Sequence, residues 1–491
     1  MNIWFADFDA VLAGQSAWIA AIVFVLGLQT VLTLQHRPWL DEWQALQLAV
    51  QSPRLSDLMF NLRYEGHPPL WYLILRGLAW LTPDQTLALP LAAILIAVPV
   101  QLTILLAAPF SRAERLMISL SEFVLFEYLT VSRSLTLGIA LMIAVVALWK
   151  HPRLVWLPIV MLPMSDFLFG VISVLFVVLR WRERQISWPF VALWIVSGLC
   201  AAWSIRPMPD IVVALLPKGV VHDFMLWLAD VGTLGLPIQW NLTRLQWNSQ
   251  TPLGLGGPAL IGFFAVAWIE LRKKPDYAVA FGAFALTTLA FNLAIYHLSL
   301  RHLTLAALLL ILLVWRMADD GTDRSVWWRA WLLVIAACGL FTATINFVEP
   351  FDTASDAVAA IEQLGLHDKA WVAFPHSAGQ DVAALDGMVF ERLNQHCTED
   401  FIRWNQPDEH AVKSDIAMKK RLTRKVAADG HFYLMTRFNF ADDPRLMHRI
   451  AAVPAGYDGE NYYMYSVGDG APEARPHNQP CNGPHPALRR G

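Results

Sequence analysis

The sequence predicts an all-α polytopic membrane domain followed by a small α/β domain outside the membrane. The chain has 491 residues, of which 56% are hydrophobic and 16% are charged, whereas water-soluble domains carry about 25% charged residues. Charge is also unevenly distributed: residues 1–347 contain 42 charged side chains, about 12%, and residues 348–491 contain 35, about 24%. The first part is therefore predicted to be surrounded by lipid and the second by water.

Apolar runs bounded by charged residues define the predicted membrane spans. There are eleven such runs: 17–34, 86–109, 116–131, 135–149, 154–164, 167–179, 187–205, 256–271, 278–296, 303–315 and 327–347. The first run lacks a small-residue cleavage site, which favours a retained anchor over a cleavable signal peptide. The segment 68–82 is short and carries Arg76 in its middle, so it is predicted to be an interfacial or re-entrant helix that does not cross.

Lysine and arginine clusters orient these spans, because basic residues accumulate in cytoplasmic loops. With the N-terminus inside, the clusters all fall on the cytoplasmic side: Arg112/Arg115, Lys150/Arg153, Arg180/Arg182/Arg184, Arg272/Lys273/Lys274 and Arg316/Arg324. An odd number of spans then places the C-terminal part on the extracytoplasmic side.

Two long outer loops follow from this scheme, residues 35–85 and 206–255. In the first loop, Asp41–Val50 carries Trp43, Leu46 and Val50 at helical spacing, which predicts an amphipathic helix on the membrane surface. The second loop is rich in Trp, Pro and Gly and has no strong period.

Residues 348–468 are predicted to form the α/β domain, and residues 469–491 a disordered, proline-rich tail. The residue pattern predicts helices over 355–364 and 413–426 and strands over 370–374, 432–435 and 462–467.

Composition excludes some partners and sites. The net charge is −3, so there is no basic stripe that would neutralise nucleic-acid phosphates, and no nucleic-acid partner is expected. The four cysteines have neither a zinc-binding spacing nor the pattern of a disulfide framework. Cys397 and Cys481 lie in the soluble part and would be able to pair in an oxidising compartment.

Seven ionisable residues fall at the outer ends of spans or in the first outer loop: Asp41, Glu42, His67, Arg133, Asp166, Arg301 and His302. Ionisable side chains close to lipid are costly and are functional candidates by default. We expect them to converge on one cleft at the outer membrane surface, which suits chemistry on a lipid-anchored substrate.

Four short motifs carry most of these residues in a fixed order: Leu40-Asp41-Glu42-Trp43, Glu65-Gly66-His67-Pro68-Pro69-Leu70-Trp71-Tyr72, Ser132-Arg133-Ser134-Leu135 and Leu300-Arg301-His302-Leu303. This order resembles the GT-C superfamily of integral-membrane glycosyltransferases, specifically the bacterial relatives of protein O-mannosyltransferases and of the lipid A aminoarabinose transferase. The resemblance covers roughly residues 17–315, and its most specific element is the Asp-Glu pair followed about 25 residues later by His-Pro-Pro-Leu.

The resemblance implies a GT-C-like multi-pass protein of the bacterial cytoplasmic membrane. It implies a donor sugar, hexosyl or pentosyl, carried on polyprenyl phosphate, and an acidic residue of the first outer loop that is central to catalysis. The acceptor, whether a lipid, a glycan or a protein, and the identity of the sugar are not specified.

The chain also departs from the family pattern. Leu135 stands where relatives have an aromatic residue two positions after the arginine matching Arg133. Ser165-Asp166-Phe167 replaces a Thr-His or His-His pair, which puts metal coordination in doubt. A carboxylate is itself a suitable ligand for a hard cation, so Asp166 is the candidate ligand if a divalent metal ion is used.

Sugar transfer from a lipid phosphate gives each residue a candidate role. A carboxylate must accept the proton of the attacking hydroxyl, for which Asp41 is the first candidate and Glu42 the second. Arginines that fork onto phosphate oxygens would stabilise the leaving group, and Arg133, Arg301 and His302 are the candidates. His67 is a further substrate-binding candidate, and Trp43, with Trp39, would be able to stack on a sugar ring.

Each assignment has a structural alternative. Asp41 would serve as the N-cap of a helix beginning at Glu42, and Asp166 as a cap between two short helices. His67 would belong only to a rigid chain entry with Pro68 and Pro69. Arg133 and Arg301 would be anchors that snorkel to the lipid headgroups.

Three functional hypotheses are compatible with these residues. The first is a membrane glycosyltransferase acting on the outer side of the cytoplasmic membrane. The second is a transporter or lipid flippase, which would need ionisable groups near mid-membrane; Glu122, inside a predicted span together with Glu127, is the residue that favours it. The third, a non-catalytic scaffold, leaves the Asp41, His67, Arg133 and Arg301 set without a purpose.

Overall fold

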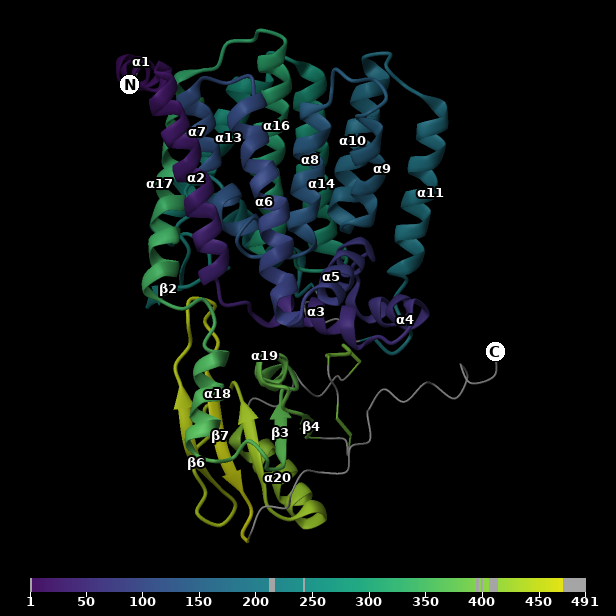
Figure 1. Cartoon of the computed structure of the whole chain (residues 1–491), viewed down its shortest axis with the longest axis vertical. Helices are drawn as coiled ribbons and strands as arrows, with labels where there is room; N and C mark the ends of the chain where they lie inside the picture. Colours follow the sequence, from purple (N-terminus) through teal and green to yellow (C-terminus); the bar gives the residue numbers. More distant parts are fainter. Residues whose placement is uncertain are drawn as a thin grey trace.

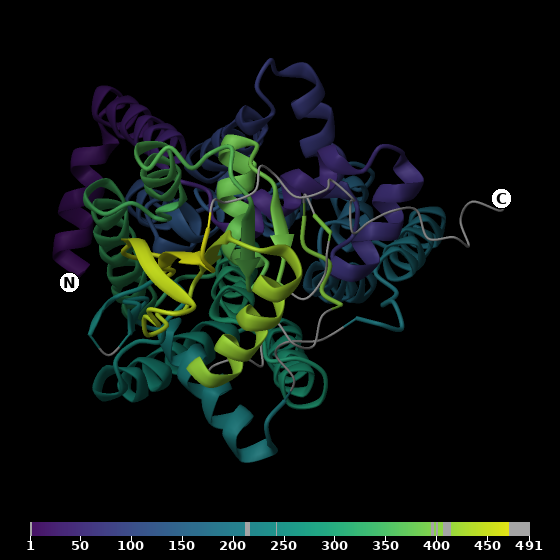
Figure 2. The same cartoon turned by 90° about the horizontal axis from the view of Figure 1, so that it is seen from below.

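A helical bundle and a smaller sheet-containing domain make up the molecule (Figure 1). The computed structural model describes residues 2–211, 217–241, 243–393, 397–398, 401–405 and 414–470. The long helices of the bundle run side by side, and the C-terminal domain lies against one end of it. Viewed from that end, the domain covers the middle of the bundle and leaves helices at its edge uncovered (Figure 2).

Six helical stretches in the described part of the chain are long and apolar enough to cross a membrane. They comprise α2 (Gln15–Gln35), η1 with α6 (Gln85–Leu87 and Ala88–Ala107), α13 (Leu253–Leu271), α14 (Pro275–Ala294), α15 with α16 (Leu300–Leu303 and Leu305–Asp319) and α17 (Val326–Val348). The first part of the sequence therefore does form a bundle of apolar helices suited to lipid.

The other five predicted runs are helices that are shorter or interrupted. They correspond to α7 (Arg112–Ser119) with η2 (Glu122–Tyr128), α8 (Ser134–Ala147), α9 (Trp156–Met161) with η3 (Leu162–Met164), α10 (Phe167–Arg182) and α11 (Trp188–Ser204). A helix rises about 1.5 Å per residue, and a span needs about 20 residues. Fewer helices than the eleven predicted spans thus reach membrane length.

The first outer loop folds into three short helices at the bundle end that meets the C-terminal domain: α3 (Leu40–Gln51), α4 (Leu55–Glu65) and α5 (Leu70–Leu81). The predicted helix over Asp41–Val50 is confirmed as α3. The 12 residues of α5 are too few to span a membrane, in agreement with the prediction that 68–82 does not cross.

The second outer loop is more ordered than its sequence predicts. It contains α12 (Val220–Thr233) and a hairpin of β1 (Trp240–Asn241) and β2 (Arg244–Leu245). The helix escapes sequence analysis because two acidic residues, Asp223 and Asp230, are buried on it beside Trp227 and Val231. Buried polar positions interrupt the apolar period by which an amphipathic helix is recognised.

The C-terminal domain has a five-stranded sheet in the order β4-β3-β5-β7-β6. The strands β3 (Trp371–Phe374), β4 (Phe390–Arg392) and β5 (Phe432–Thr436) are parallel, whereas β7 (Tyr462–Val467) pairs antiparallel with both β5 and β6 (Met447–Val453). The described part of the domain also contains the helices α18 (Ala354–Gln363), α19 (Ser377–Asp386) and α20 (Asp415–Asp429).

The predicted helices and strands of this domain are confirmed, apart from residue 413, which lies outside the described residues. Sequence analysis missed α19, β4 and β6, which are short or half-exposed and therefore weakly patterned. Cys397 is disulfide-bonded. Its predicted partner Cys481 and most of the predicted tail, 471–491, lie outside the described residues.

At Gly339, α17 packs tightly against the backbone between α7 and η2. A Cβ atom at this position would lie 2.1 Å from Leu120 O and 2.6 Å from Glu122 N, both backbone atoms that cannot rotate away. We expect Gly339→Ala to destabilise the bundle by about 2 kcal/mol or more, because overpacking forces the backbone to shift. The measurement is the thermal unfolding midpoint of the full chain in detergent.

Gly282 on α14 provides the matched control, since a Cβ there meets nothing within 4 Å. We expect Gly282→Ala to be neutral or stabilising, because alanine is the better helix former. Equal unfolding midpoints for the two variants would contradict the close packing of α17.

Candidate active site at the bundle end that meets the C-terminal domain

The first turn of α3 places two adjacent carboxylates in different surroundings. Glu42 is fully buried, and both its oxygens accept hydrogen bonds. Oε2 accepts from His36 Nε2 (2.8 Å) and from the backbone N–H of Trp39 (3.2 Å), and Oε1 accepts from Ser132 N (2.7 Å). Glu42 therefore closes the N-terminus of α3 and joins it to the loop before α8. This geometry disfavours Glu42 as a second base, because the side chain is buried and both its oxygens already accept hydrogen bonds from the protein.

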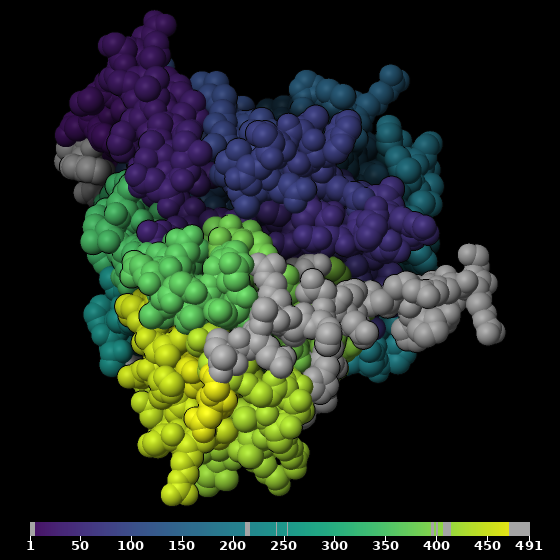
Figure 3. All heavy atoms as spheres, turned by 60° about the horizontal axis from the view of Figure 1, so that its bottom comes forward, coloured from purple at the N-terminus to yellow at the C-terminus, as the bar shows by residue number. Residues whose placement is uncertain are grey.

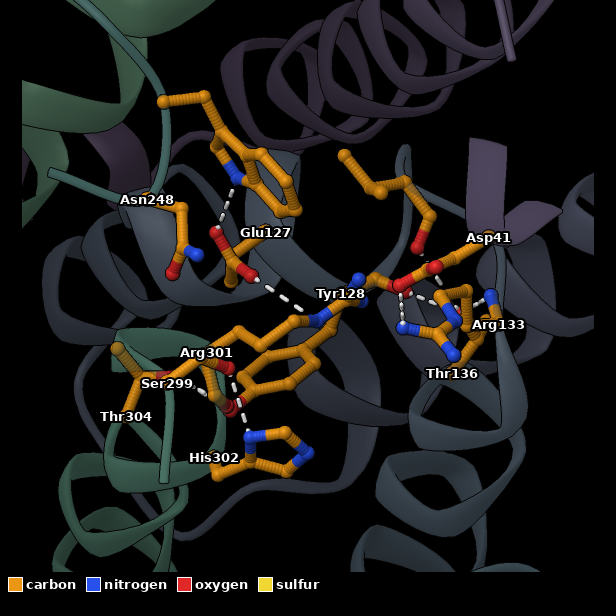
Figure 4. Close-up of polar contacts among 12 residues, drawn as sticks. Asp41, Glu127, Tyr128, Arg133, Thr136, Asn248, Ser299, Arg301, His302 and Thr304 are labelled. Atoms are coloured by element: carbon orange, nitrogen blue, oxygen red, sulfur yellow. Dashed lines mark hydrogen bonds and ion pairs between the residues drawn. The ribbon is translucent and has the colours of Figure 1, made fainter. Parts of the chain in front are cut away.

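Asp41 points instead to Arg133. Arg133 Nη1 donates a hydrogen bond to Asp41 Oδ2 (Figure 4). The Asp41 side chain is 24% exposed, against 10% for Arg133, so Oδ1 of the carboxylate remains accessible to a second partner. The alternative role of Asp41 as an N-cap is not realised, because Trp39 occupies that position and Asp41 lies inside the helix.

His67 and Asp166 hold Arg133 from the other side. His67 Nδ1 lies 2.8 Å from Asp166 Oδ2, and Arg133 Nη2 lies 3.4 Å from His67 Nε2. These partners favour the tautomer in which Nδ1 carries the proton and Nε2 accepts from arginine. Asp166 also accepts a hydrogen bond from Leu168 N (3.2 Å) as the N-cap of α10, so the predicted capping role is confirmed.

The surroundings of Asp166 do not fit a metal ion. His67 Nδ1 is bound to Asp166, and Nε2 of the same histidine faces the Arg133 guanidinium, which would repel a cation. Across the residues that the structure describes, no group of three or more His, Cys, Asp or Glu side chains is arranged to hold a metal. We therefore derive no chemical step through a metal at Asp166.

Arg301 on α15 is the most unusual cation of the site. The residue is only 2% exposed, and its Nε, Nη1 and Nη2 atoms all lack hydrogen-bond partners within the described ranges. Its nearest counter-charge is Glu127 Oε1, 3.6 Å from Nε, and it interacts electrostatically with Asp41 and Arg133. Figure 4 shows the side chain directed toward Glu127, with Tyr128 alongside. Burying unsatisfied guanidinium donors is costly, so this group is poised for an anion.

His302 lies near the network, whereas Trp43 is buried away from it. His302 lies within electrostatic range of Asp166 and His67, and its Nδ1 is 2.7 Å from Ser299 Oγ. Trp43 is only 3% exposed and packs in the hydrophobic core of the bundle, so no ring face is open to a sugar. Its proposed stacking role is corrected for that reason. Trp39 lies beside the site, with its ring centroid 6.0 Å from the Arg133 guanidinium carbon.

Trp247, in the second outer loop, is a site residue that sequence analysis missed. Its Nε1 donates to Glu127 Oε2 (2.9 Å), and its ring centroid lies 5.4 Å from the Arg301 guanidinium carbon. The ring also meets Trp39 edge-on at 4.7 Å. The signal for this contact was the pair of acidic residues in the apolar run 116–131, which had no assigned partner: Glu127 binds Trp247 and Arg301, and Glu122 accepts from Gln239 Nε2 (3.2 Å).

The C-terminal domain fixes Trp247 in place. The backbone N–H of Trp247 donates to Tyr457 O (2.8 Å), and Arg244 Nη1 donates to Ala455 O (3.2 Å). Trp247, Phe351 and Tyr457 pack in one aromatic cluster with Phe126 of η2. The segment from Arg244 to Trp247 thus contacts Arg301 on one side and the C-terminal domain on the other.

A second attachment, the segment 401–405, enters the first outer loop. Ile402 exchanges two backbone hydrogen bonds of 2.8 Å with the Gln44 side chain, Arg403 Nη2 donates to Asn61 Oδ1 (2.9 Å), and Phe401 is buried in the core of the bundle. The space-filling view shows the C-terminal domain packed directly against the N-terminal part of the chain (Figure 3). The C-terminal domain is therefore part of the structure that surrounds Asp41.

Asp41, Arg133, His67 and Asp166 thus form one connected network, and Arg301 and His302 lie next to it. Comparisons of the chain with protein-family models, curated proteins and solved structures find no match. An accessible carboxylate oxygen beside two guanidinium groups is able to accept a proton near a bound anion.

Three buried aspartates lie where the C-terminal domain meets the site. Tyr462 Oη is 2.9 Å from Oδ2 of both Asp352 and Asp381, and Asp458 lies beside Asp352. Burial, reinforced by the charge of Asp352, raises the pKa of Asp381 well above its ordinary value, although Arg437, 3.6 Å away, opposes the shift. Burial likewise raises the pKa values of Asp352 and Asp458. The folded domain therefore holds protons that an unfolded chain would release.

The stability of the C-terminal domain should fall as the pH rises. A carboxyl whose folded pKa is raised contributes stability that is fully present below the unfolded pKa of about 3.9 and is lost as the pH passes through the folded value. We expect amide hydrogen exchange in β5 of the full chain to accelerate beyond the intrinsic chemical rate as the pH rises above the unfolded pKa of about 3.9. Asp381→Asn should flatten this dependence, whereas Asp356→Asn on exposed α18 should not. An identical slope in Asp381→Asn and the wild type would contradict the assignment.

Proposed function

We propose that the chain is a membrane glycosyltransferase that moves a sugar from a polyprenyl-phosphate donor to an acceptor on the extracytoplasmic side of the membrane. The observation that carries the proposal is the juxtaposition of an accessible carboxylate, Asp41, with a buried guanidinium, Arg301, that has no hydrogen-bond partner in the described ranges. The first can take a proton, and the second can take a phosphate. The resemblance of the four sequence motifs to the GT-C superfamily points the same way.

The proposed reaction assigns one task to each group. The acceptor hydroxyl gives its proton to Asp41 Oδ1 as its oxygen forms a bond to the anomeric carbon. The bond from that carbon to the phosphate oxygen breaks, and its electron pair stays on the phosphate. Arg301 stabilises the charge that develops there, while Arg133, aligned by His67, keeps Asp41 in place.

The test is sugar transfer by the purified full chain in lipid vesicles. Polyprenyl-phosphate-linked sugars would be supplied one at a time with an envelope extract as acceptor, and release of polyprenyl phosphate would be measured. Cells lacking the protein should accumulate the lipid-linked sugar that is the true donor. Absence of both release and accumulation with any lipid-linked sugar would reject the proposal.

Transport of a lipid-linked substrate is the alternative, and the buried Glu122 is the observation in its favour. Glu122 accepts from Gln239, however, and lies near Glu127 in η2 and not in the Asp41 network. Glu122→Gln should leave sugar transfer nearly unchanged if the protein is a transferase. If it is a transporter, the same change should reduce movement of the lipid between leaflets, with no sugar released.

The proposal includes orientation: eleven spans, the N-terminus inside and Asp41 outside, in a bacterial cytoplasmic membrane. The basic clusters at the bundle end away from the C-terminal domain support it. We expect a periplasmically active reporter fused after Asn346 to be active, and one fused after Lys150 to be inactive. The reverse pattern would overturn the orientation and, with it, an extracytoplasmic acceptor.

A further inference from the structure

A cavity of about 510 Å³ opens at the bundle end opposite to Asp41. It lies where α8, α10 and α16 end and α14 begins, at the level expected for lipid headgroups. Its volume is within the range of small-ligand sites. No step of the proposed transfer reaction uses this cavity, so a ligand bound in it would be independent of that reaction.

The cavity wall carries one net positive charge. Its four cations are Lys150, Arg182, Lys274 and Arg316, and its three carboxylates are Glu183, Asp276 and Asp320. Behind the wall, Arg180 and Asp319 add one charge of each sign. The ion pairs at the rim are exposed to solvent: Arg182–Asp276 joins side chains that are 59% and 51% exposed, and the Lys150 side chain is 66% exposed. Such pairs are weak and exchange readily with another anion.

Two buried guanidinium groups flank Trp149 of the wall. The guanidinium carbons of Arg180 and Arg316 lie 5.3 Å and 5.1 Å from its ring centroid. Arg180 is fully buried and Arg316 is 5% exposed. Within the described ranges, Nε of both and Nη2 of Arg180 lack an acceptor. Of the two, Arg316 lines the cavity, so its Nε is the donor that matches a phosphate oxygen, whereas Arg180 lies behind the wall.

One exposed face of α10, the helix whose end borders the cavity, is apolar. Val174, Val178 and Trp181 are exposed on α10 at spacings of four and three residues, so they share one face that ends beside Arg182. A phosphate in the cavity would therefore have a hydrophobic surface next to it for acyl chains.

We propose that this cavity binds the phosphodiester of a membrane lipid headgroup, whose single negative charge balances the wall. Basic pockets between membrane helices recognise lipid headgroups in this way. The lipid would join the ends of four helices at the bundle end remote from the catalytic network.

The test measures retention of phosphatidylglycerol by the full chain in detergent, using native mass spectrometry and the thermal unfolding midpoint. Lys150→Gln with Arg182→Gln should weaken binding about fivefold for each charge removed, since a basic residue near a headgroup contributes about that factor. Asp276→Asn should strengthen binding, because it increases the positive charge of the wall. All three positions are at least half exposed, so folding should be preserved.

Arg153→Gln is the matched control, because Arg153 is exposed at the same membrane end but does not line the cavity. Equal retention by the cavity variants and by Arg153→Gln would overturn the proposal, as would equal binding of diacylglycerol, which lacks phosphate. Stabilisation by inorganic phosphate alone, with the same dependence on Lys150 and Arg182, would support a phosphate site but assign it to a soluble ligand.

Discussion

Asp41→Asn should abolish sugar transfer, lowering kcat by between about 10² and 10⁴-fold, the range that a general base contributes. The asparagine keeps an oxygen that can accept the hydrogen bond of Arg133, so the network around His67 and Asp166 should stay in place. What is lost is the ability to take a proton. The measurement is release of polyprenyl phosphate under single-turnover conditions, with donor binding determined separately.

Asp84→Asn provides the control, because Asp84 is an exposed aspartate of the same outer loop. It should transfer sugar at the wild-type rate, and both variants should unfold at similar temperatures. Transfer by Asp41→Asn at close to the wild-type rate would remove Asp41 as the base. Since Glu42 has both oxygens engaged, that result would leave neither carboxylate of α3 as a base.

Arg301→Ala should lower kcat/KM for the lipid donor by about 10² to 10³-fold, which is typical for the loss of one group that stabilises a developing negative charge. Arg301→Lys should recover only part of this loss, because an ammonium lacks the planar fork that matches a phosphate. Glu127 would keep its hydrogen bond from Trp247 in both variants, so the fold around it should survive.

Arg54→Ala tests whether any outer arginine has this effect, since Arg54 is exposed on the first outer loop. Its donor dependence should match the wild type. If Arg301→Ala also left donor dependence unchanged, Arg301 would be a packing or anchoring residue. A loss of acceptor affinity with an unchanged donor KM would instead assign Arg301 to the acceptor.

The helical nature of the membrane domain was predictable because hydrophobic runs bounded by charges are a strong signal. The short helix α3 was predictable from the spacing of Trp43, Leu46 and Val50, yet that same spacing made Trp43 a core residue. An apolar stripe on a helix is buried against something, and the sequence alone does not say whether a protein core or a sugar covers it.

The roles of Asp41 and Glu42 show where sequence reasoning stops. Adjacent residues on a helix point about 100° apart, so only one of the two carboxylates could face Arg133. Which of the two faces Arg133 depends on His36 and Ser132, which bind Glu42 from the loops before α3 and before α8. The contact between Trp247 and Glu127 was harder still to predict, because 120 residues separate the two and the loop of Trp247 has no regular pattern.

The attachment of segment 401–405 to α3 and α4 has a consequence for biogenesis. A ribosome makes the helices around Asp41 long before it makes this segment or the Tyr457 loop that holds Trp247. During synthesis, the surroundings of Asp41 and Trp247 therefore stay incomplete until the last quarter of the chain has been made. Under the proposed function, a chain terminated before this segment would lack these contacts around Asp41 and would be inactive.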